Sequence, residues 1–427
     1  MPCFIHRYRW LMVGLLFFMS VNNYLDRQSL SVLAKTLRGE LQFGAVEYSY
    51  IVTAFLVAFA LGYTFCGALI DRYGARWVYF IALLAWSVAI FCHGLATSWV
   101  ALAVWRFALG LGESFNAPAG AKVIAEWTPR SERGLSMAIF SNGNIVGAMI
   151  APPLIAGIAL HFGWQWGFVF SGAVGLAVLW LWWRMYHPPE THPRLSSEER
   201  NHILRERGAA AVEATSWRDL LCQPMCWGFL GARFFTDSLS FFFSFWLPEY
   251  LQTSRGFSLA MLALVGWIPF LAADVGGPGG GALSDWLVRR GLPARRARLS
   301  LMAGAALLMP LSLWAVRTPN TALAVGLIAV LLMAASCWNV NLLTLAAESV
   351  PRAQVATLVA LSGFGGALGG ILSTLATGQT IQRFGYVPVF TAVGGLHLVA
   401  LGILWWAIRA AAAKPNASLS DVAAGLS

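Results

Sequence analysis

Four ionisable residues lie inside two long apolar stretches of the chain. Asp26 and Arg27 are adjacent within the first stretch, and Arg106 and Glu113 lie within the fourth. A charged side chain at membrane depth is costly, so it normally faces a cavity or pathway in which it has a function. Because both stretches carry an acid and an Arg, we expect a pathway for an organic anion that moves together with a proton.

The composition places these residues in a membrane protein. Hydrophobic residues make up 58% of the 427 positions, charged residues make up 11%, and the mean hydropathy is +0.65. A spanning helix needs about 20 apolar residues, and the sequence accommodates twelve such helices. We therefore expect an all-α fold with spans near residues 11–33, 48–70, 77–96, 99–125, 134–160, 165–186, 226–251, 260–283, 299–316, 321–346, 353–377 and 386–410.

The positive charges indicate how these spans are oriented. Most of the 29 Lys and Arg residues fall in alternate loops and in the termini, including Arg72, Arg76 and the 289–298 cluster. Cytoplasmic loops carry such an excess, so we expect both termini in the cytoplasm and the chain in a bacterial inner membrane. The net charge of +10 then reflects topology and affinity for anionic lipids, and no nucleic-acid partner is expected.

A polar segment divides the chain into two similar halves. We expect a six-helix bundle over 1–186, a cytoplasmic linker over 187–225 and a second six-helix bundle over 226–427. The string GALIDRYGAR at 67–76 has a weaker copy, GALSD, at 281–285, and Phe162-Gly163-Trp164 has the copy Phe384-Gly385-Tyr386. Parallel repeats of this kind occur in secondary transporters.

These motifs resemble a known family. The string at 67–76 is similar to the signature loop of the major facilitator superfamily, in the loop where that family has it. The segments at 23–27, 106–113 and 126–133 resemble the anion:cation symporter branch, and those at 118–122, 147–154, 232–237 and 270–274 resemble its hexuronate transporters. The resemblance implies two six-helix bundles around a central cavity, alternating access, no cofactor, and transport driven by the proton gradient. We expect a monomer, with Na+ as the alternative coupling ion.

The residue types assign roles within the expected cavity. Arg presents a planar fork that holds a carboxylate through two hydrogen bonds, so Arg27 is the leading anion ligand, with Arg106 as a second candidate. Burial favours a neutral carboxyl group and a nearby Arg favours the charged one, so Asp26 and Glu113 are the expected proton carriers. A sugar acid also has hydroxyl groups, for which we expect Tyr24, Trp338 and Asn341.

Structural roles are the alternatives for several of these residues. At a rise of about 1.5 Å per residue, the four charged residues fall in one layer if the first and fourth spans face each other. Arg106 and Glu113 are seven residues apart and share a helix face, so they are expected to be able to pair. For Asn341 the alternative is a hydrogen bond between helices. For Arg27 the alternative is a static contact with Asp26 or with a backbone carbonyl.

Further charged residues lie in the second half and near the cytoplasmic ends of the spans. Arg233, Asp237 and Asp274 are second-half candidates, and Arg233 and Asp237 have the spacing of a pair that neutralises itself. The set near the cytoplasmic ends is interpreted as a closing latch between the bundles, not as ligands: Asp71, Arg72, Arg76, Lys122, Glu126, Asp285 and Glu348.

Other classes of protein are less compatible with the sequence. The seven His residues are dispersed, so neither a metal site nor a membrane-embedded enzyme is expected. A sensor on the same fold would not need the intramembrane acids, and no nucleotide-binding GxxxxGK[ST] motif supports ATP drive. We therefore expect a proton-coupled importer of a hexuronate or related sugar acid. An aldonate, aromatic acid or dicarboxylic acid is the alternative substrate.

Overall fold

The computed structural model describes residues 8–129, 131–206 and 220–412, and these residues form helices and connecting turns without a β-strand. The helices of the first half are α1 (Tyr8–Val32), α2 (Ala34–Glu40), α3 (Ala45–Tyr73), α4 (Ala75–His93), α5 (Trp99–Glu113), α6 (Asn116–Trp127), α7 (Arg133–Phe162) and α8 (Trp164–Met185). After the short helix α9 (Ser197–Glu206), the chain continues into α11 (Pro224–Thr253), α12 (Leu259–Val265), α13 (Ile268–Arg289), α14 (Ala294–Leu308), η2 (Met309–Leu311), α15 (Ser312–Arg317), α16 (Thr321–Ser349), α17 (Arg352–Phe384) and α18 (Val387–Ala412).

Nine stretches of the described residues are long and apolar enough to cross a membrane. They correspond to nine of the twelve expected spans, and the other three spans correspond to α1, α5–α6 and α11. These three contain Asp26, Arg106 and Arg233 with their charged neighbours, and the one that contains Arg106 is divided into two helices of 15 and 12 residues. The total of twelve spans and the cytoplasmic termini stay predictions.

Three expected spans are interrupted. The span expected over 99–125 is divided at Ser114 and Phe115 into α5 and α6, and the one over 260–283 is divided at Gly266 and Trp267 into α12 and α13. In the span expected over 299–316, Pro310 lies in the short 3-10 segment η2 between α14 and α15. Proline lacks an amide hydrogen, which favours such an interruption of the α-helical hydrogen bonds.

Glycines at corresponding turns confirm the internal repeat. Gly74, between α3 and α4, has a φ of 80°, and Gly291, between α13 and α14, has a φ of 92°. The second repeat behaves in the same way, since Gly163 has a φ of 94° and Gly385 has a φ of 73°. This left-handed region is readily available only to glycine, which explains why glycine occurs at both copies of each turn.

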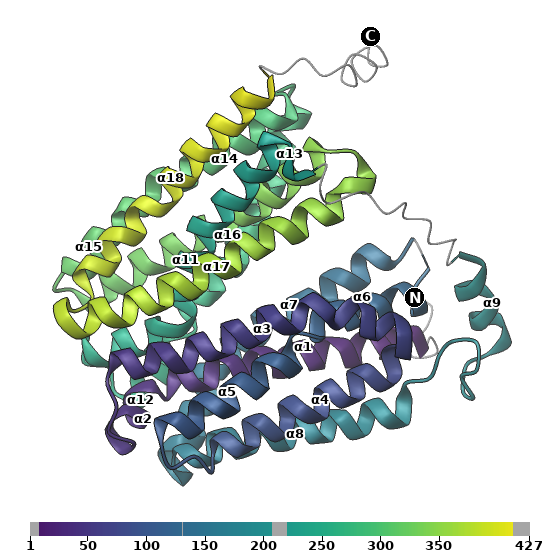
Figure 1. Ribbon diagram of the computed structural model, residues 1–427, viewed down its shortest axis with the longest axis horizontal. Helices are drawn as coiled ribbons and strands as arrows, with labels where there is room; N and C mark the ends of the chain where they lie inside the picture. Colours follow the sequence, from purple (N-terminus) through teal and green to yellow (C-terminus); the bar gives the residue numbers. More distant parts are fainter. Residues whose placement is uncertain (1–7, 130, 207–219, 413–427) are drawn as a thin grey trace. The chain divides into compact units, whose positions relative to one another are not determined.

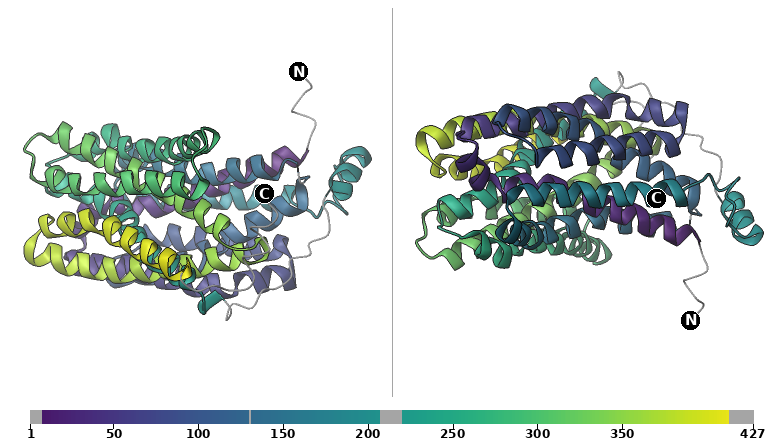
Figure 2. Two further views of the ribbon diagram at one scale, coloured as in Figure 1. Left: turned by 90° about the horizontal axis from the view of Figure 1, so that it is seen from above. Right: turned by 90° about the horizontal axis from the view of Figure 1, so that it is seen from below.

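The described helices form two compact units. Unit 1 comprises the described residues of 1–211, 241–271 and 371–386, and unit 2 comprises those of 212–240, 272–370 and 387–427. Within unit 1, α1 packs along α7, α3 along α5 and α4 along α8, as Figure 1 shows. The two further views in Figure 2 show α9 beyond the long helices at one end of this unit.

The units do not coincide with the expected halves of the chain. The second part of α11 and the second part of α17 belong to unit 1, although both helices follow the linker in sequence. Two contacts join α11 to unit 1: Glu249 forms an ion pair with Arg38, and the hydroxyl of Tyr48 donates to the carbonyl of Phe245 over 2.8 Å. The division into bundles at 1–186 and 226–427 stays a prediction, and residues 207–219 of the expected linker lie outside the described residues.

Candidate functional site

Helices α1 and α5 bring the four charged residues together. Arg27 donates through Nε to Oε2 of Glu113 over 2.6 Å, and this pair joins two helices that are far apart in sequence. The side chain of Glu113 is fully buried, whereas that of Arg27 retains 18% exposure. The expectation that the four residues share one layer is confirmed. The pair leaves its Arg partly accessible, which a ligand for an incoming anion requires.

Arg106 makes different contacts from those expected. Its Nη1 donates to the carbonyl of Asp26 over 3.3 Å, and its Nη2 donates to the carbonyl of Arg27 over 2.9 Å. The suggested Arg106–Glu113 pair is therefore wrong for this structure, because Glu113 pairs with Arg27 instead. The guanidinium group of Arg106 is fully buried, and it holds the backbone of α1 at Asp26 and Arg27.

Asp26 lies in a separate environment. Its Oδ2 accepts a hydrogen bond from Nδ2 of Asn22 over 2.9 Å, and Ser171 of α8 lies beside it without forming a hydrogen bond of normal geometry. Asp26 is fully buried, and among the described residues its Oδ1 has no hydrogen-bond partner. No Arg or Lys in this part of the chain forms an ion pair with it. An unpaired buried carboxylate is costly, which distinguishes Asp26 from the paired Glu113.

Aromatic rings surround the guanidinium group of Arg27. Its Cζ lies 5.0 Å from the ring centre of Tyr24, 5.2 Å from that of Phe55 and 4.8 Å from that of Phe59. Phe55 also lies 5.0 Å from Cζ of Arg106, so one ring contacts both cations. Sequence reasoning missed Phe55. The available signal was the i, i+4 spacing of Phe55, Phe59 and Tyr63 on one face of α3, where the rings stack at 5.8 and 5.7 Å.

The second-half candidates lie in unit 2. Arg233 donates through Nε and Nη2 to Oδ2 of Asp237 over 2.9 and 2.7 Å, so the expected self-neutralising pair is present. Trp338 packs at 5.1 Å against His397 of α18, and Asn341 donates to the carbonyl of Cys337 over 2.9 Å. Both side chains are buried inside this unit. The structure gives Asp274 no ion pair among the described residues.

The residues expected to form a latch pair within the units. In unit 1, Nζ of Lys122 lies 2.8 Å from Oδ1 of Asp71, and the hydroxyl of Tyr186 donates to Glu126 over 2.7 Å. The same unit places Arg72 against Tyr73 and Arg76 against Trp183. In unit 2, Arg298, which sequence reasoning included only as part of a basic cluster, lies 2.7 Å from Asp285 and 3.3 Å from Glu348. A latch between bundles stays a prediction.

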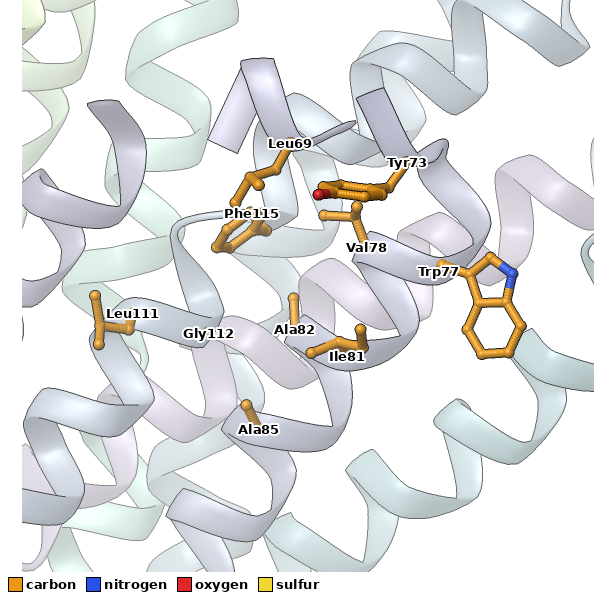
Figure 3. Close-up of a pocket in the computed structure, with 10 residues that line it drawn as sticks. All are labelled: Leu69, Tyr73, Trp77, Val78, Ile81, Ala82, Ala85, Leu111, Gly112 and Phe115. Carbon is orange, nitrogen blue, oxygen red and sulfur yellow. The ribbon is translucent and has the colours of Figure 1, made fainter. Parts of the chain in front are cut away.

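An apolar groove of about 510 Å³ lies elsewhere in unit 1. Figure 3 shows its side chains, which come from α3, α4 and the junction of α5 with α6 and include Tyr73, Trp77, Ile81 and Phe115. None of the residues with expected ligand or proton roles lines it. An apolar lining of this kind suits lipid and not a sugar acid, so the groove is not the candidate site.

Comparison with known proteins agrees with the fold. The sequence matches the profile of the Major Facilitator Superfamily over residues 16–374. It is 30% identical over 409 residues to the hexuronate transporter of Escherichia coli K12, with 94% of each chain covered. It is 33% identical over 275 residues to the galacturonate transporter of Dickeya chrysanthemi, which covers 63% of this chain and 79% of the relative.

Another relative, the probable galactarate/D-glucarate transporter GarP of Escherichia coli K12, is 32% identical over 340 residues, with 75% of this chain and 77% of the relative covered. Among solved structures, a D-xylose-proton symporter superposes with a TM-score of 0.75 at 14% identity, covering 93% of this chain and 97% of the other. That identity supports the fold alone.

The expected resemblance to hexuronate transporters and the expectation that the protein is not an enzyme are confirmed, because these relatives are all named transporters. The relatives are bacterial, and the apolar helices identify a multi-pass protein of the inner membrane. The chain belongs to the Major Facilitator Superfamily.

Proposed function

We propose that the protein imports a sugar acid, most specifically a hexuronate, together with a proton. The observation that carries this proposal is the buried pair of Arg27 and Glu113. The two partners have a net charge of zero, and Arg27 is the more exposed of the two. The carboxylate of a substrate can therefore replace Glu113 on the guanidinium fork.

Charge balance couples this exchange to a proton. Once the substrate carboxylate neutralises Arg27, Glu113 is a buried charge without its partner, which is strongly unfavourable. A proton on Glu113 restores a net charge of zero, so one carboxylate enters with one proton. The ring of Tyr24 and that of Phe59 lie against Arg27. They leave the guanidinium poorly hydrated, and this strengthens its attraction for an anion.

The same balance favours a monocarboxylate over a dicarboxylate. A second substrate carboxylate would need another positive charge or another proton. Arg106 is occupied by the carbonyls of α1, and Arg233 is occupied by Asp237. The relatives include transporters named for hexuronate and for galactarate and D-glucarate. In the charged cluster of α1 and α5, Arg27 is partly exposed and Arg106 is fully buried, which supports the first class.

Alternating access would require the contacts of unit 1 to break and re-form. The ion pair of Arg38 with Glu249, together with the hydrogen bond from Nε2 of Gln252 to the carbonyl of Val32 at 3.0 Å, ties the second part of α11 to the ends of α1 and α2. By the positive-inside interpretation, this end of α1 faces away from the cytoplasm. These contacts support a state that is closed on the outer side.

The test is binding and uptake by the purified protein. Galacturonate, glucuronate, galactonate and galactarate are compared with galactose, a matched control that lacks the carboxylate. A true ligand raises the thermal midpoint by mass action, corresponding to about 2.7 kcal/mol at a hundredfold excess over Kd. We expect the hexuronates to give the largest shift and to accumulate in proteoliposomes under an inward proton gradient. Equal binding of galactose would contradict the proposal.

A further inference from the structure

Helix α9 is attached to the beginning of α1. The carboxylate of Glu199 accepts the backbone N–H groups of Tyr8 and Arg9 over 3.1 and 3.3 Å, and it also accepts from Nη1 of Arg9 over 3.1 Å. The first N–H groups of a helix lack partners within the helix, so Glu199 provides a cap for α1. Ser196 in turn caps α9 by accepting the N–H of Glu199 over 3.1 Å.

Arg9 connects a third helix to this contact. Its Nε and Nη2 donate to the two carboxylate oxygens of Glu132, at the start of α7, over 2.6 and 2.8 Å. Arg9 is only 2% exposed, so it forms a buried junction of α1, α7 and α9. Both α1 and α7 belong to the bundle that holds Asp26 and Arg27, and α9 therefore acts at the far end of the helix that carries the candidate site.

His192 fills the space between the chain before α9 and the bundle. Its ring lies 4.2 Å from that of Tyr8 and 5.2 Å from that of Trp127, and the residue is 1% exposed. Its Nδ1 lies 3.2 Å from the backbone N–H of Arg194, which is a donor, so Nδ1 accepts. Its Nε2 lies 3.0 Å from the carbonyl of Met185 and must therefore donate. These two bonds together require the neutral ring.

The surroundings of His192 oppose a positive charge. Burial lowers the pKa of His192, and the neighbouring groups His187, Arg194 and Arg200 lower it further, while the bond to Met185 acts in the opposite direction. The facing groups from α1 and α6 are the rings of Tyr8 and Trp127. The carboxylate of Glu199 is bonded to Arg9. No acid among the described residues pairs with the His192 ring.

We infer that residues 187–206 form an acid-released clip on the cytoplasmic end of α1, with His192 as the group that opens it. Protonation of Nδ1 would break the bond from Arg194 and place a buried positive charge beside Arg194 and Arg200. The pKa of His192 is lower when the segment is docked, so His192 binds a proton more readily after the segment is released. The clip is therefore fully stable above the ordinary His value of about 6.5, and it weakens progressively as the pH falls below that value.

Hydrogen exchange of the full-length protein in nanodiscs tests this inference without substrate or a proton gradient. Protection of the α9 amides is measured from pH 7.5 to pH 5.5 and corrected for the pH dependence of the chemical exchange rate. We expect protection to fall about tenfold for each pH unit below the ordinary His value. Unchanged protection of the wild type at pH 5.5 would overturn the inference.

Two isosteres and one control complete the experiment. His192→Asn keeps an acceptor in place of Nδ1, and His192→Gln keeps a donor in place of Nε2, but neither variant titrates. If α9 is protected at pH 7.5 in one of these variants, we expect it to stay protected at pH 5.5 in that variant. The control is His161→Asn, because His161 is exposed and bonded within α7, and this variant should retain the wild-type response. Acid release in both isosteres would assign the effect to another group and contradict the inference.

Discussion

The Arg27–Glu113 pair and the Arg233–Asp237 pair both join an Arg to an acid, but their topologies differ. The Arg27–Glu113 pair joins α1 to α5, whereas the Arg233–Asp237 pair lies within α11 at a spacing of i and i+4. A pair between helices changes when one helix moves against the other, but a pair within one helix moves as a unit. Only in the first pair can ligand binding change the partner of the Arg. We therefore assign the coupling of proton and substrate to the Arg27–Glu113 pair.

The largest effect should follow from Arg27→Lys. A Lys ammonium group is a point charge that cannot reproduce the guanidinium fork, and breaking a buried pair costs about 3–5 kcal/mol. Uptake of galacturonate in proteoliposomes should therefore fall roughly 100-fold or more. Arg255→Lys is a suitable control, because Arg255 contacts Tyr250 away from this pair. Normal uptake by Arg27→Lys would contradict binding through the fork.

A smaller effect is expected for Arg106→Lys. The guanidinium of Arg106 bonds two successive carbonyls of α1, and Lys can keep part of this interaction. The loss of one hydrogen bond to a charged group is about 1.5–3 kcal/mol, so the thermal midpoint should fall by several degrees and uptake by roughly tenfold. If Arg106 instead bound substrate directly, as the sequence suggested, substrate binding would be lost to the same extent as in Arg27→Lys.

The smallest effect is expected when both members of the second pair are neutralised. Arg233→Gln or Asp237→Asn alone leaves a buried charge without its partner, whereas the double variant leaves none. We therefore expect the double variant to transport within about threefold of the wild type. The matched double variant Arg27→Gln with Glu113→Gln should stay inactive, although it also removes a complete pair. If both double variants transported substrate equally well, the two pairs would not differ in function.

The sequence alone located the four charged residues of α1 and α5 but not their partners. The cost of charge at membrane depth was enough to identify Asp26, Arg27, Arg106 and Glu113. The choice of partner depends on the rotation of each helix about its axis, and an apolar sequence constrains that rotation weakly. Arg106 therefore bonds carbonyls instead of Glu113. Backbone carbonyls occur at every position, so no residue type could indicate that contact.

Local breaks and aromatic neighbours were also difficult to foresee. The apolar run over 99–125 continues across Ser114 and Phe115, where the structure separates α5 from α6. Hydropathy measures composition and does not detect such an interruption. Phe55 lies among many Phe residues of similar surroundings, and its position between Arg27 and Arg106 depends on the packing of α3 against α5. The internal repeat, in contrast, was visible in the sequence, because the strings at 67–76 and 162–164 have copies in the second half.

The most direct test of the coupling compares two transport assays of the Glu113→Gln variant in proteoliposomes: counterflow exchange and proton-driven accumulation. Gln is an uncharged isostere of the protonated acid, so Arg27 is free to bind a carboxylate but no proton is released. We expect counterflow exchange of galacturonate to continue and proton-driven accumulation to be lost. Accumulation by Glu113→Gln against the substrate gradient, with the pH dependence of the wild type, would show that the Arg27–Glu113 pair is structural and would contradict the account.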